Sequence, residues 1–170
     1  MNSPHRVVAC FGLALYSACG TGPYFVPTPT SDAQSGEMRT DSLIFRAATH
    51  IRDEPRDIVQ TEITVINSSQ HLVTLLVPGG CPVIFQLLTS PPPGGREVWD
   101  SRKTRSSMGC ALSLLVTRIS RGESRVFVRQ VEKAEILGDS LPPGRYFVRS
   151  QLDLDPVPIT LYAGELTLSR

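Results

Sequence analysis

Short segments in which apolar and polar residues alternate follow one another from Asp41 to the end of the chain. The clearest is IVQTEITVIN (58–67), where alternation places Ile63 and Val65 on one face and Thr64 on the other. Seven further segments show the same behaviour: HLVTLLV (71–77), CPVIFQLLTS (81–90), EVWDS (97–101), ALSLLVTRI (111–119), SRVFVRQV (124–131), RYFVRSQLD (145–153) and ITLYAGELTL (159–168). Their content of β-branched and aromatic residues predicts strands.

Turn residues separate these segments at close intervals. They are Pro78-Gly79-Gly80, Pro91 to Gly95, Arg121-Gly122-Glu123 and Pro142-Pro143-Gly144. Only Ser68-Ser69-Gln70 lies between the first two segments, a spacing typical of a hairpin. Helical periodicity is never sustained, and RQVEKAEIL (129–137) has helix formers for one short turn at most. The pattern predicts an all-β fold, an immunoglobulin-like antiparallel β-sandwich of about seven to eight strands.

Two aromatic residues sharpen the prediction of a sandwich. In LPPGRY (141–146), a proline-rich turn stands immediately before a strand, so the Tyr146 hydroxyl can donate a hydrogen bond back across the corner. Such a tyrosine corner is a device of immunoglobulin-like sandwiches, and an ordinary core tyrosine is the alternative. Trp99, the single tryptophan, is expected in or at the edge of the core.

Length and charge limit what the chain can be. At 170 residues, with 41% hydrophobic and 19% charged residues, it can bury one sizeable core, and no internal repeat suggests two domains. A formal net charge of +1 gives no field that would attract nucleic acid or an anionic membrane surface. We therefore expect one domain and no nucleic-acid partner.

Residues 1–18 have the pattern of a secretory signal. A short polar start carrying Arg6 precedes an apolar run from Val7 to Leu15 that is too short to span a bilayer. Small residues then lead to Cys19, and small-small-Cys resembles a bacterial lipobox, which implies lipidation of Cys19, palmitate included, and a membrane anchor. Tyr16 stands where a lipobox usually carries leucine. Ordinary cleavage after Ala18, giving a secreted protein, is the alternative.

Residues 19–40 have the composition of a spacer. Three prolines lie there among Gly, Ser and Thr, with few large apolar residues, so the segment is predicted to be a flexible linker and residues 41–170 the domain. Removing Arg6 with the signal leaves 16 basic residues (17 − 1) against 16 acidic ones. The anchor is expected in the bacterial cell envelope, at a periplasmic or outer-membrane face. The Asp that follows the cysteine in many inner-membrane lipoproteins of some enterobacteria is absent, since Gly20 stands there, which is a hint toward the outer membrane and leaves the inner membrane open.

Two of the four cysteines remain for the domain. Cys10 lies in the signal and Cys19 in the lipobox, which leaves Cys81 and Cys110. In an oxidising compartment this pair predicts a disulfide, whose loop closure would stabilise the fold by about 3.5 kcal/mol. Zinc sites show closely spaced ligand pairs and redox motifs show C-x-x-C, and neither spacing is present.

Four motifs in a fixed order resemble a known family. ITVINSS comes first, then VIFQLLTS with GGREVWDS, then ISRGESRVF and finally LPPGRYFVRSQL. This order, from Ile58 to Arg170, resembles the intracellular proteinase inhibitor family called BsuPI. The resemblance implies an immunoglobulin-like domain and a proteinase-inhibitor activity. The Cys81/Cys110 pair and the lipobox do not belong to an intracellular protein, and the tryptophan often found after the Glu-Ser turn is absent.

No pattern indicates catalysis or a metal. Gly122-Glu123-Ser124 is followed by Arg125 and not by the residues of a nucleophile elbow, and neither His-Glu-x-x-His nor a phosphate-binding glycine loop occurs. Asp153 and Asp155 could bind calcium, but beside Pro156 they fit a strand end or turn better. We expect no cofactor, no metal and no enzyme activity.

The candidate binding segment is DSRKTRSSMG (100–109). Its basic residues Arg102, Lys103 and Arg105 lie inside the predicted disulfide loop. An extended loop presenting Lys or Arg suits a trypsin-like protease, and rigidity lowers the entropic cost of binding. The alternative is a solvated, variable surface loop.

Three hypotheses about function follow. The first is a non-enzymatic envelope lipoprotein whose β-sandwich serves as a protein-interaction module, with a protein partner in the envelope. The second is a proteinase inhibitor of the BsuPI type, whose partner is a protease. The third, a small hydrolase or metal-binding protein, would use residues such as Asp153 or His71 and has no support in the spacing of the sequence.

Overall fold

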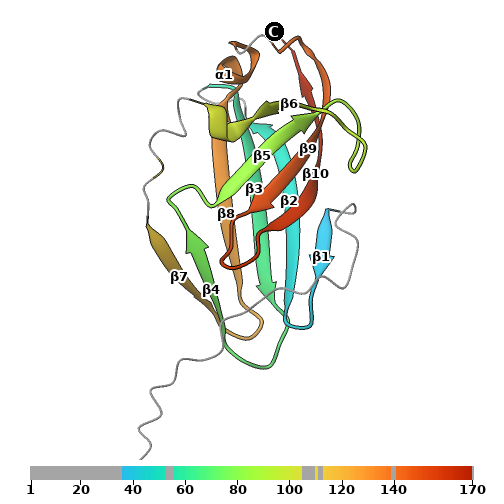
Figure 1. Cartoon of the computed structure of the whole chain (residues 1–170). Coiled ribbons are helices and arrows are strands. Elements are labelled where there is room, and N and C mark those ends of the chain that lie inside the picture. Colours follow the sequence, from blue (N-terminus) through green and yellow to red (C-terminus); the bar gives the residue numbers. More distant parts are fainter. Residues whose placement is uncertain (1–35, 53–55, 105–109, 111–112, 139–140, 170) are drawn as a thin grey trace, which may run out of the picture.

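Inward-facing apolar side chains define the strands. In β3 (Ile58–Asn67), Ile63 and Val65 are fully buried and Thr64 between them is partly exposed, as the alternation predicts. The computed structural model describes residues 36–52, 56–104, 110, 113–138 and 141–169 (Figure 1). The other strands are β1 (Glu37–Arg39), β2 (Leu43–Arg52), β4 (Val73–Pro78), β5 (Val83–Leu88), β6 (Glu97–Asp100), β7 (Leu114–Ile119), β8 (Ser124–Glu132), β9 (Gly144–Leu152) and β10 (Ile159–Leu168).

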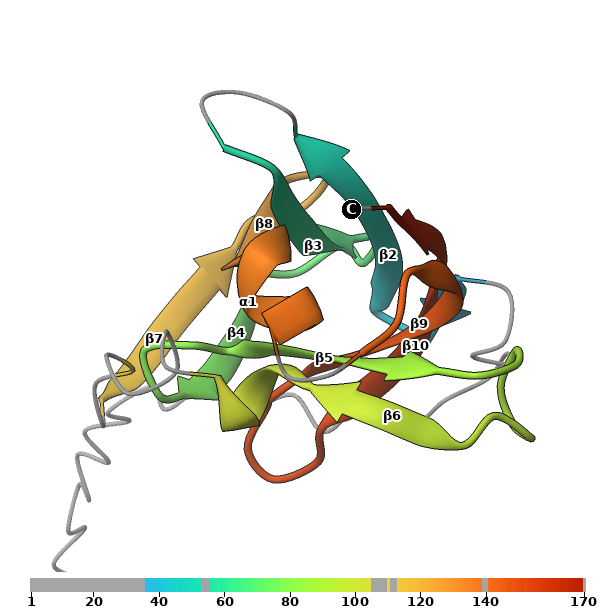
Figure 2. The same ribbon diagram turned by 90° about the horizontal axis from the view of Figure 1, so that it is seen from above.

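The strands form an antiparallel sandwich, so the predicted fold class is confirmed. The first sheet has the order β1-β2-β3-β8 and the second sheet the order β10-β9-β5-β6, while β4 and β7 form a separate pair. Figure 2 shows the first and second sheets as two layers. A short helix, α1 (Lys133–Gly138), lies at one end between them, and the 3-10 turn η2 (Ser101–Lys103) follows β6.

The described residues form ten strands where the sequence predicted about seven to eight. All eight predicted segments contain a strand, and the two additional ones are β1 and β2. β2 carries Ala47 and Ala48, which have low strand propensity, and its ten residues are held by pairing with β3 along their whole length. Tertiary pairing therefore supplies what local propensity lacks.

The folded part begins before Asp41. β1 lies within the segment predicted to be a linker, yet Met38 is buried and Glu37, Met38 and Arg39 pair with β2. Ala47 N also donates to Gly36 O at 2.9 Å. The linker prediction is thus wrong for residues 36–40, because one buried methionine and a short strand add to the sheet. The signal, Cys19 and the rest of the predicted linker lie outside the described residues.

β3 and β4 do not form the hairpin that their spacing suggested. β3 pairs with β2 and β8, whereas β4 pairs with β7, so the chain leaves the first sheet after Asn67. The buried Asn67 side chain holds this crossing: Nδ2 donates to His71 O at 2.7 Å and Ile119 O at 2.8 Å. Its Oδ1 accepts from Ser69 N at 2.9 Å. A local side-chain network replaces strand pairing here.

Two apolar clusters form the core between the layers. Near β4 and β7 the larger buried residues are Leu43, Phe45, Ile63, Leu75, Ile119 and Leu161, and near α1 they are Phe85, Leu87, Trp99, Ile136 and Tyr146. Trp99 is buried with its ring centroid 5.2 Å from that of Phe85, as expected. The helical expectation for residues 129–137 is confirmed only from Lys133, because Arg129 to Glu132 continue β8 beside β3.

The predicted tyrosine corner is present. Tyr146 lies near the start of β9, is buried, and donates its hydroxyl hydrogen to Pro142 O at 2.6 Å. The bond spans the proline-rich turn that the sequence placed before the strand. Within the described part of the chain, no helix is long and apolar enough to cross a membrane.

Candidate functional site

The basic residues of the candidate binding loop are ion-paired where the structure describes them. Arg102 and Lys103 lie in η2, with Arg102 Nη2 2.5 Å from Asp100 Oδ2 and Lys103 Nζ 3.5 Å from Glu97 Oε1. The expectation of an extended segment is wrong for these two residues, because the backbone turns into a 3-10 helix after Asp100. Arg105 lies outside the described residues.

Asp100 organises this turn from a buried position. Its Oδ1 accepts from Arg102 N at 2.8 Å, and its Oδ2 accepts from Gln86 Nε2 at 2.9 Å. Burial by itself would raise the pKa of Asp100, but hydrogen bonds from Arg102 and Gln86 outweigh it and hold the pKa at about 2. The carboxylate is therefore ionised at neutral pH and fixes η2 against β5.

The predicted disulfide between Cys81 and Cys110 is present and spans a separation of 29 residues. Cys81 follows the end of β4 and Cys110 precedes the start of β7, and Pro78 and Leu114 are the last pair in the register of those strands. The bridge therefore holds together the open end of the β4–β7 pair. Both cysteines are partly exposed.

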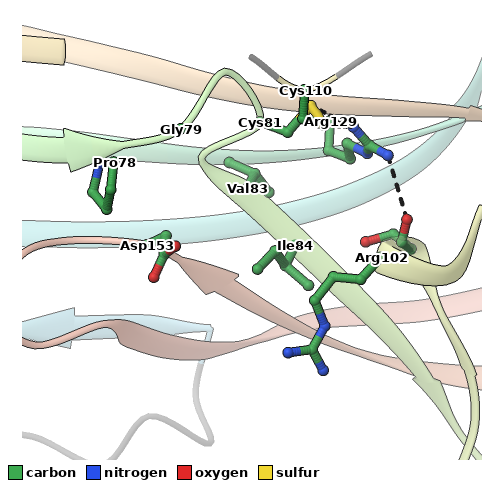
Figure 3. Close-up of a pocket in the computed structure, with 10 residues that line it drawn as sticks. Pro78, Gly79, Cys81, Val83, Ile84, Arg102, Cys110, Arg129 and Asp153 are labelled. Carbon is green, nitrogen blue, oxygen red and sulfur yellow. Dashed lines mark hydrogen bonds between the residues drawn. A yellow bond between two sulfur atoms is a disulfide. The ribbon is translucent and has the colours of Figure 1, made fainter. Parts of the chain in front are cut away.

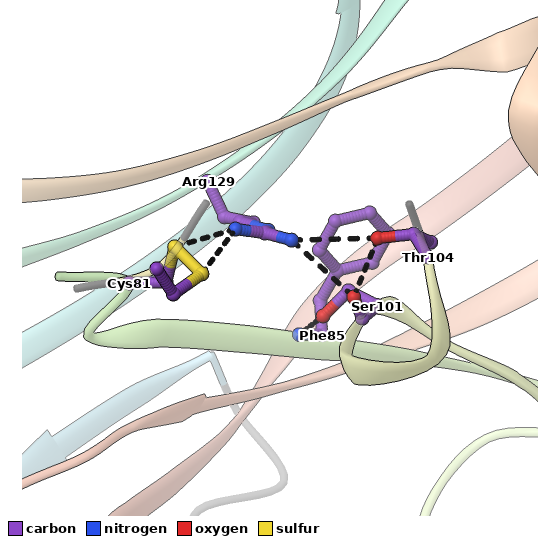
Figure 4. Close-up of a disulfide and its surroundings, with 6 residues drawn as sticks. Cys81, Phe85, Ser101, Thr104 and Arg129 are labelled. Carbon is purple, nitrogen blue, oxygen red and sulfur yellow. Dashed lines mark hydrogen bonds between the residues drawn. A yellow bond between two sulfur atoms is a disulfide. The ribbon is translucent and has the colours of Figure 1, made fainter. Parts of the chain in front are cut away.

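Arg129 lies beside the disulfide and was not anticipated as a site residue. It projects from β8 across the space between the layers, and Nη1 donates to Cys81 Sγ at 2.8 Å and to Cys110 Sγ at 3.3 Å (Figure 4). Nη2 donates to Ser101 O at 3.3 Å and to Thr104 Oγ1 at 3.4 Å. The alternation along β8 could have indicated its inward position, because Arg129 lies on the same face of the strand as Phe127 and Val131.

The side chain of Arg129 is largely buried. The residue is 7% exposed, and burial lowers the pKa of its guanidinium below the ordinary value, with Glu135 opposing this at longer range. No carboxylate forms an ion pair with it in the part of the chain that the structure describes. Its Nε is buried without a hydrogen-bond partner among the same residues. Burying a cation against neutral acceptors alone lowers the free energy of unfolding.

A cavity of about 260 Å³ opens beside this cluster. Figure 3 shows Cys81, Cys110 and Arg129 on one side of it, with Asp153 opposite and Arg102 turned away from Arg129. Both cysteines of the bridge therefore line a space that is open to solvent.

The other candidate residues are not brought together. Asp153 lines the cavity, Asp155 is exposed and joins β4 through its backbone N, which donates to Leu76 O at 3.0 Å, and His71 is exposed. Within the described residues, no group of three or more His, Cys, Asp or Glu side chains could hold a metal ion. The backbone N of Asp153 donates to Pro82 O at 2.8 Å, so both aspartates lie in the chain that leaves β9 and are joined to neighbouring segments through their backbones.

The second unanticipated feature is an apolar strand at a sheet edge. Leu114, Leu115 and Val116 at the start of β7 are 57%, 46% and 56% exposed. Among the described strands β7 pairs only with β4, and Figure 2 shows it at one flank of the sandwich. Val126 and Val128 on β8 are exposed as well. The sequence LSLLVTRI could have indicated exposed apolar side chains, because three successive apolar residues cannot all face inward on one strand.

Comparisons with known proteins add little to this description. No protein-family model matches the sequence, and no curated protein matches it. Among solved structures, the ApaA protein of Bordetella pertussis is 12% identical over 75% of this chain and 92% of that chain, with a TM-score of 0.36. A β-glucosidase of Listeria innocua is 14% identical over 74% of this chain and 16% of that chain, with a TM-score of 0.33. At these TM-scores the likeness carries no argument about fold or function.

Proposed function

We propose that the protein is a non-enzymatic, lipid-anchored protein-interaction module of the bacterial cell envelope, and that β7 is its docking edge. The observation that carries this proposal is the run of three exposed apolar residues, Leu114 to Val116, on an edge strand. Soluble domains commonly protect such edges with charges, prolines or covering segments. Exposed apolar side chains gathered on one strand can mark an interaction site.

The partner that fits this edge is an extended apolar segment of another protein. The free backbone groups of an edge strand can pair with an added strand, and alternate side chains of the added strand supply specificity. The balance of 16 basic and 16 acidic residues beyond the signal gives no reason to expect a nucleic acid or a strongly charged partner. Apolar contact and main-chain hydrogen bonds are then the main sources of affinity.

Site-specific photocrosslinking in intact cells tests the docking edge. A photoreactive residue at position 116 should form a discrete adduct with another envelope protein, whereas one at Val157, an exposed apolar residue in the β9–β10 turn, should not. A synthetic peptide covering the crosslinked segment should then bind the purified protein, and Val116→Glu should weaken that binding at least tenfold while Val157→Glu leaves it unchanged. An adduct only with a second copy of the chain, or adducts of equal yield at both positions, would overturn the proposal.

The anchor has its own test. Metabolic labelling with an alkyne fatty acid should label the wild-type protein but not a Cys19→Ala variant, and the variant should leave the membrane fraction. Labelling that survives Cys19→Ala would contradict the lipid anchor without affecting the docking edge.

The alternative function, proteinase inhibition, rests on the resemblance to the BsuPI family. The ion pairs of Arg102 and Lys103 give it no specific support, since these side chains are held by Asp100 and Glu97 in a helical turn. Titration against a panel of serine proteases separates the two functions. Stoichiometric inhibition with an uncut chain, lost on joint replacement of Arg102, Lys103 and Arg105 by Ala, would favour the inhibitor.

A further inference from the structure

The guanidinium of Arg129 makes its shortest hydrogen bond to the disulfide. Nη1 is 2.8 Å from Cys81 Sγ, the shortest of the four hydrogen bonds that the guanidinium makes. A disulfide sulfur is a weak, neutral acceptor, so it compensates a desolvated cation poorly. The remaining acceptors, a carbonyl and a hydroxyl, are also neutral.

Reduction of the disulfide would give the Arg129 guanidinium a charged acceptor. A thiolate at Cys81 would carry a full negative charge at hydrogen-bond distance from Nη1, giving the buried guanidinium a counter-ion. A neighbouring cation lowers the pKa of a thiol, and selective stabilisation of the reduced form makes a disulfide more oxidising. Exposure of both cysteines to the cavity would let an external thiol approach them.

We propose that Cys81–Cys110 is a thiol-exchange site for dithiol reductants, in which Arg129 stabilises Cys81 as the leaving thiolate. This site goes beyond the proposed docking function and does not depend on it. The two cysteines are the reacting groups, and Arg129 stabilises the thiolate form of Cys81.

The exchange is balanced with a dithiol as the co-reactant. A thiolate of the dithiol attacks Cys110 Sγ, a mixed disulfide forms, and the electron pair of the broken Cys81–Cys110 bond goes to Cys81 Sγ beside Arg129. The second thiol of the dithiol loses its proton and attacks the first sulfur of the same dithiol in the mixed disulfide. Cys110 leaves as a thiolate and takes up a proton. The protein pair is reduced by two electrons and the dithiol is oxidised to its own disulfide.

The equilibrium test uses the full-length chain carrying Cys10→Ala and Cys19→Ala, so that Cys81 and Cys110 are the only cysteines. The protein is equilibrated in buffers of reduced and oxidised dithiothreitol, and the reduced fraction is measured by alkylation and intact mass. Arg129→Met should shift the equilibrium toward the disulfide at least tenfold, a change of about 30 mV for two electrons. Arg125→Met, an exposed arginine on the same strand, should leave the equilibrium unchanged.

A second measurement keeps the proposal falsifiable if Arg129→Met fails to fold. In the same background with Cys110→Ala and Arg129 intact, the rate of alkylation of Cys81 by iodoacetamide is followed against pH. Its midpoint should lie well below the ordinary thiol value of about 8.5. A midpoint at or above that value would overturn the proposal, and so would equal equilibria for folded Arg129→Met and Arg125→Met proteins. Either result would mean that the disulfide has a structural role only.

Discussion

Asp100 is a buried carboxylate that the structure keeps ionised, and this makes stability depend on acid pH. Its pKa is lowered from 3.8 to about 2, so the native state releases the proton more readily than the unfolded chain. The stabilisation is complete above the unfolded value, and it is lost as pH falls through the folded value. We expect the free energy of unfolding to fall by about 2 kcal/mol between about pH 4 and pH 2 from this group alone.

An Asp100→Asn variant isolates that contribution. At pH 7 it should be less stable than wild type by about 2 kcal/mol, and its free energy of unfolding should vary less with pH in the acid window. Urea denaturation at a series of pH values measures both quantities. Asp41→Asn, which alters an exposed carboxylate outside this network, serves as the control. Parallel pH profiles for wild type and Asp100→Asn would contradict the assigned role of Asp100.

Asn67 is a second polar residue whose hydrogen bonds decide a local structure. Because its buried amide joins residues 69, 71 and 119, Asn67→Ala removes the hydrogen bonds to all three at once, including the one to Ile119 O, which is buried. The variant should lose about 3 kcal/mol in urea denaturation. Gln70→Ala, at an exposed position in the same turn, should change stability by less than about 0.5 kcal/mol. Similar losses for both variants would show that the turn, and not the buried amide, is what matters.

Residue roles could be predicted from the sequence where a local motif accompanied them. Tyr146 followed a Pro-Gly turn, and Cys81 and Cys110 were the pair that remained after the N-terminal cysteines had been assigned. The position of Arg129 beside the sulfur atoms could not be predicted, because it depends on how β8 of one layer faces β5 of the other. Distances across a sandwich are set by tertiary packing and leave no local pattern.

The hairpin of β5 and β6 shows how an element depends on one small residue. A Cβ added to Gly95 would lie 2.1 Å from Ser90 O and 2.8 Å from Leu88 Cβ, whereas a Cβ on Gly94 would meet no atom within 4 Å. Gly95→Ala should therefore destabilise the protein by about 2 kcal/mol or more through steric overlap, and Gly94→Ala by less than about 0.5 kcal/mol. Thermal unfolding of the two variants checks this, and equal melting temperatures would contradict it.

The strands were largely predictable from the sequence, but their pairing was not. Alternation located β3 to β10 because each half-buried strand repeats with a period of two. Pairing depends on residues distant in sequence, and the short spacing between β3 and β4 was misleading because Asn67 directs the chain out of the first sheet. β1 was missed for a related reason: three residues carry no periodic signal, and β2 supplies their partners.

Two features connect separate parts of the sandwich. Arg129 reaches from the first sheet to residues that precede and follow strands of the second, and the disulfide closes the end of the β4–β7 pair near the exposed start of β7. The proposed exchange site and the proposed docking edge are thus neighbours along the chain. The start of β7 is also held by its pairing with β4, in which Leu114 lies opposite Pro78, so the exchange site and the docking edge can be tested separately.

The boundary of the domain gives the last prediction. β1 adds three residues to the first sheet and buries Met38, so a domain beginning at residue 36 should be more stable than one beginning at residue 41. Burial of a methionine side chain contributes about 1.5–3 kcal/mol, and we expect a difference of about that size in urea denaturation. Met38→Ala in the longer domain should reproduce most of the loss, which separates side-chain burial from strand pairing. Equal stability of the proteins beginning at residues 36 and 41 would mean that β1 pairs with β2 without stabilising the fold.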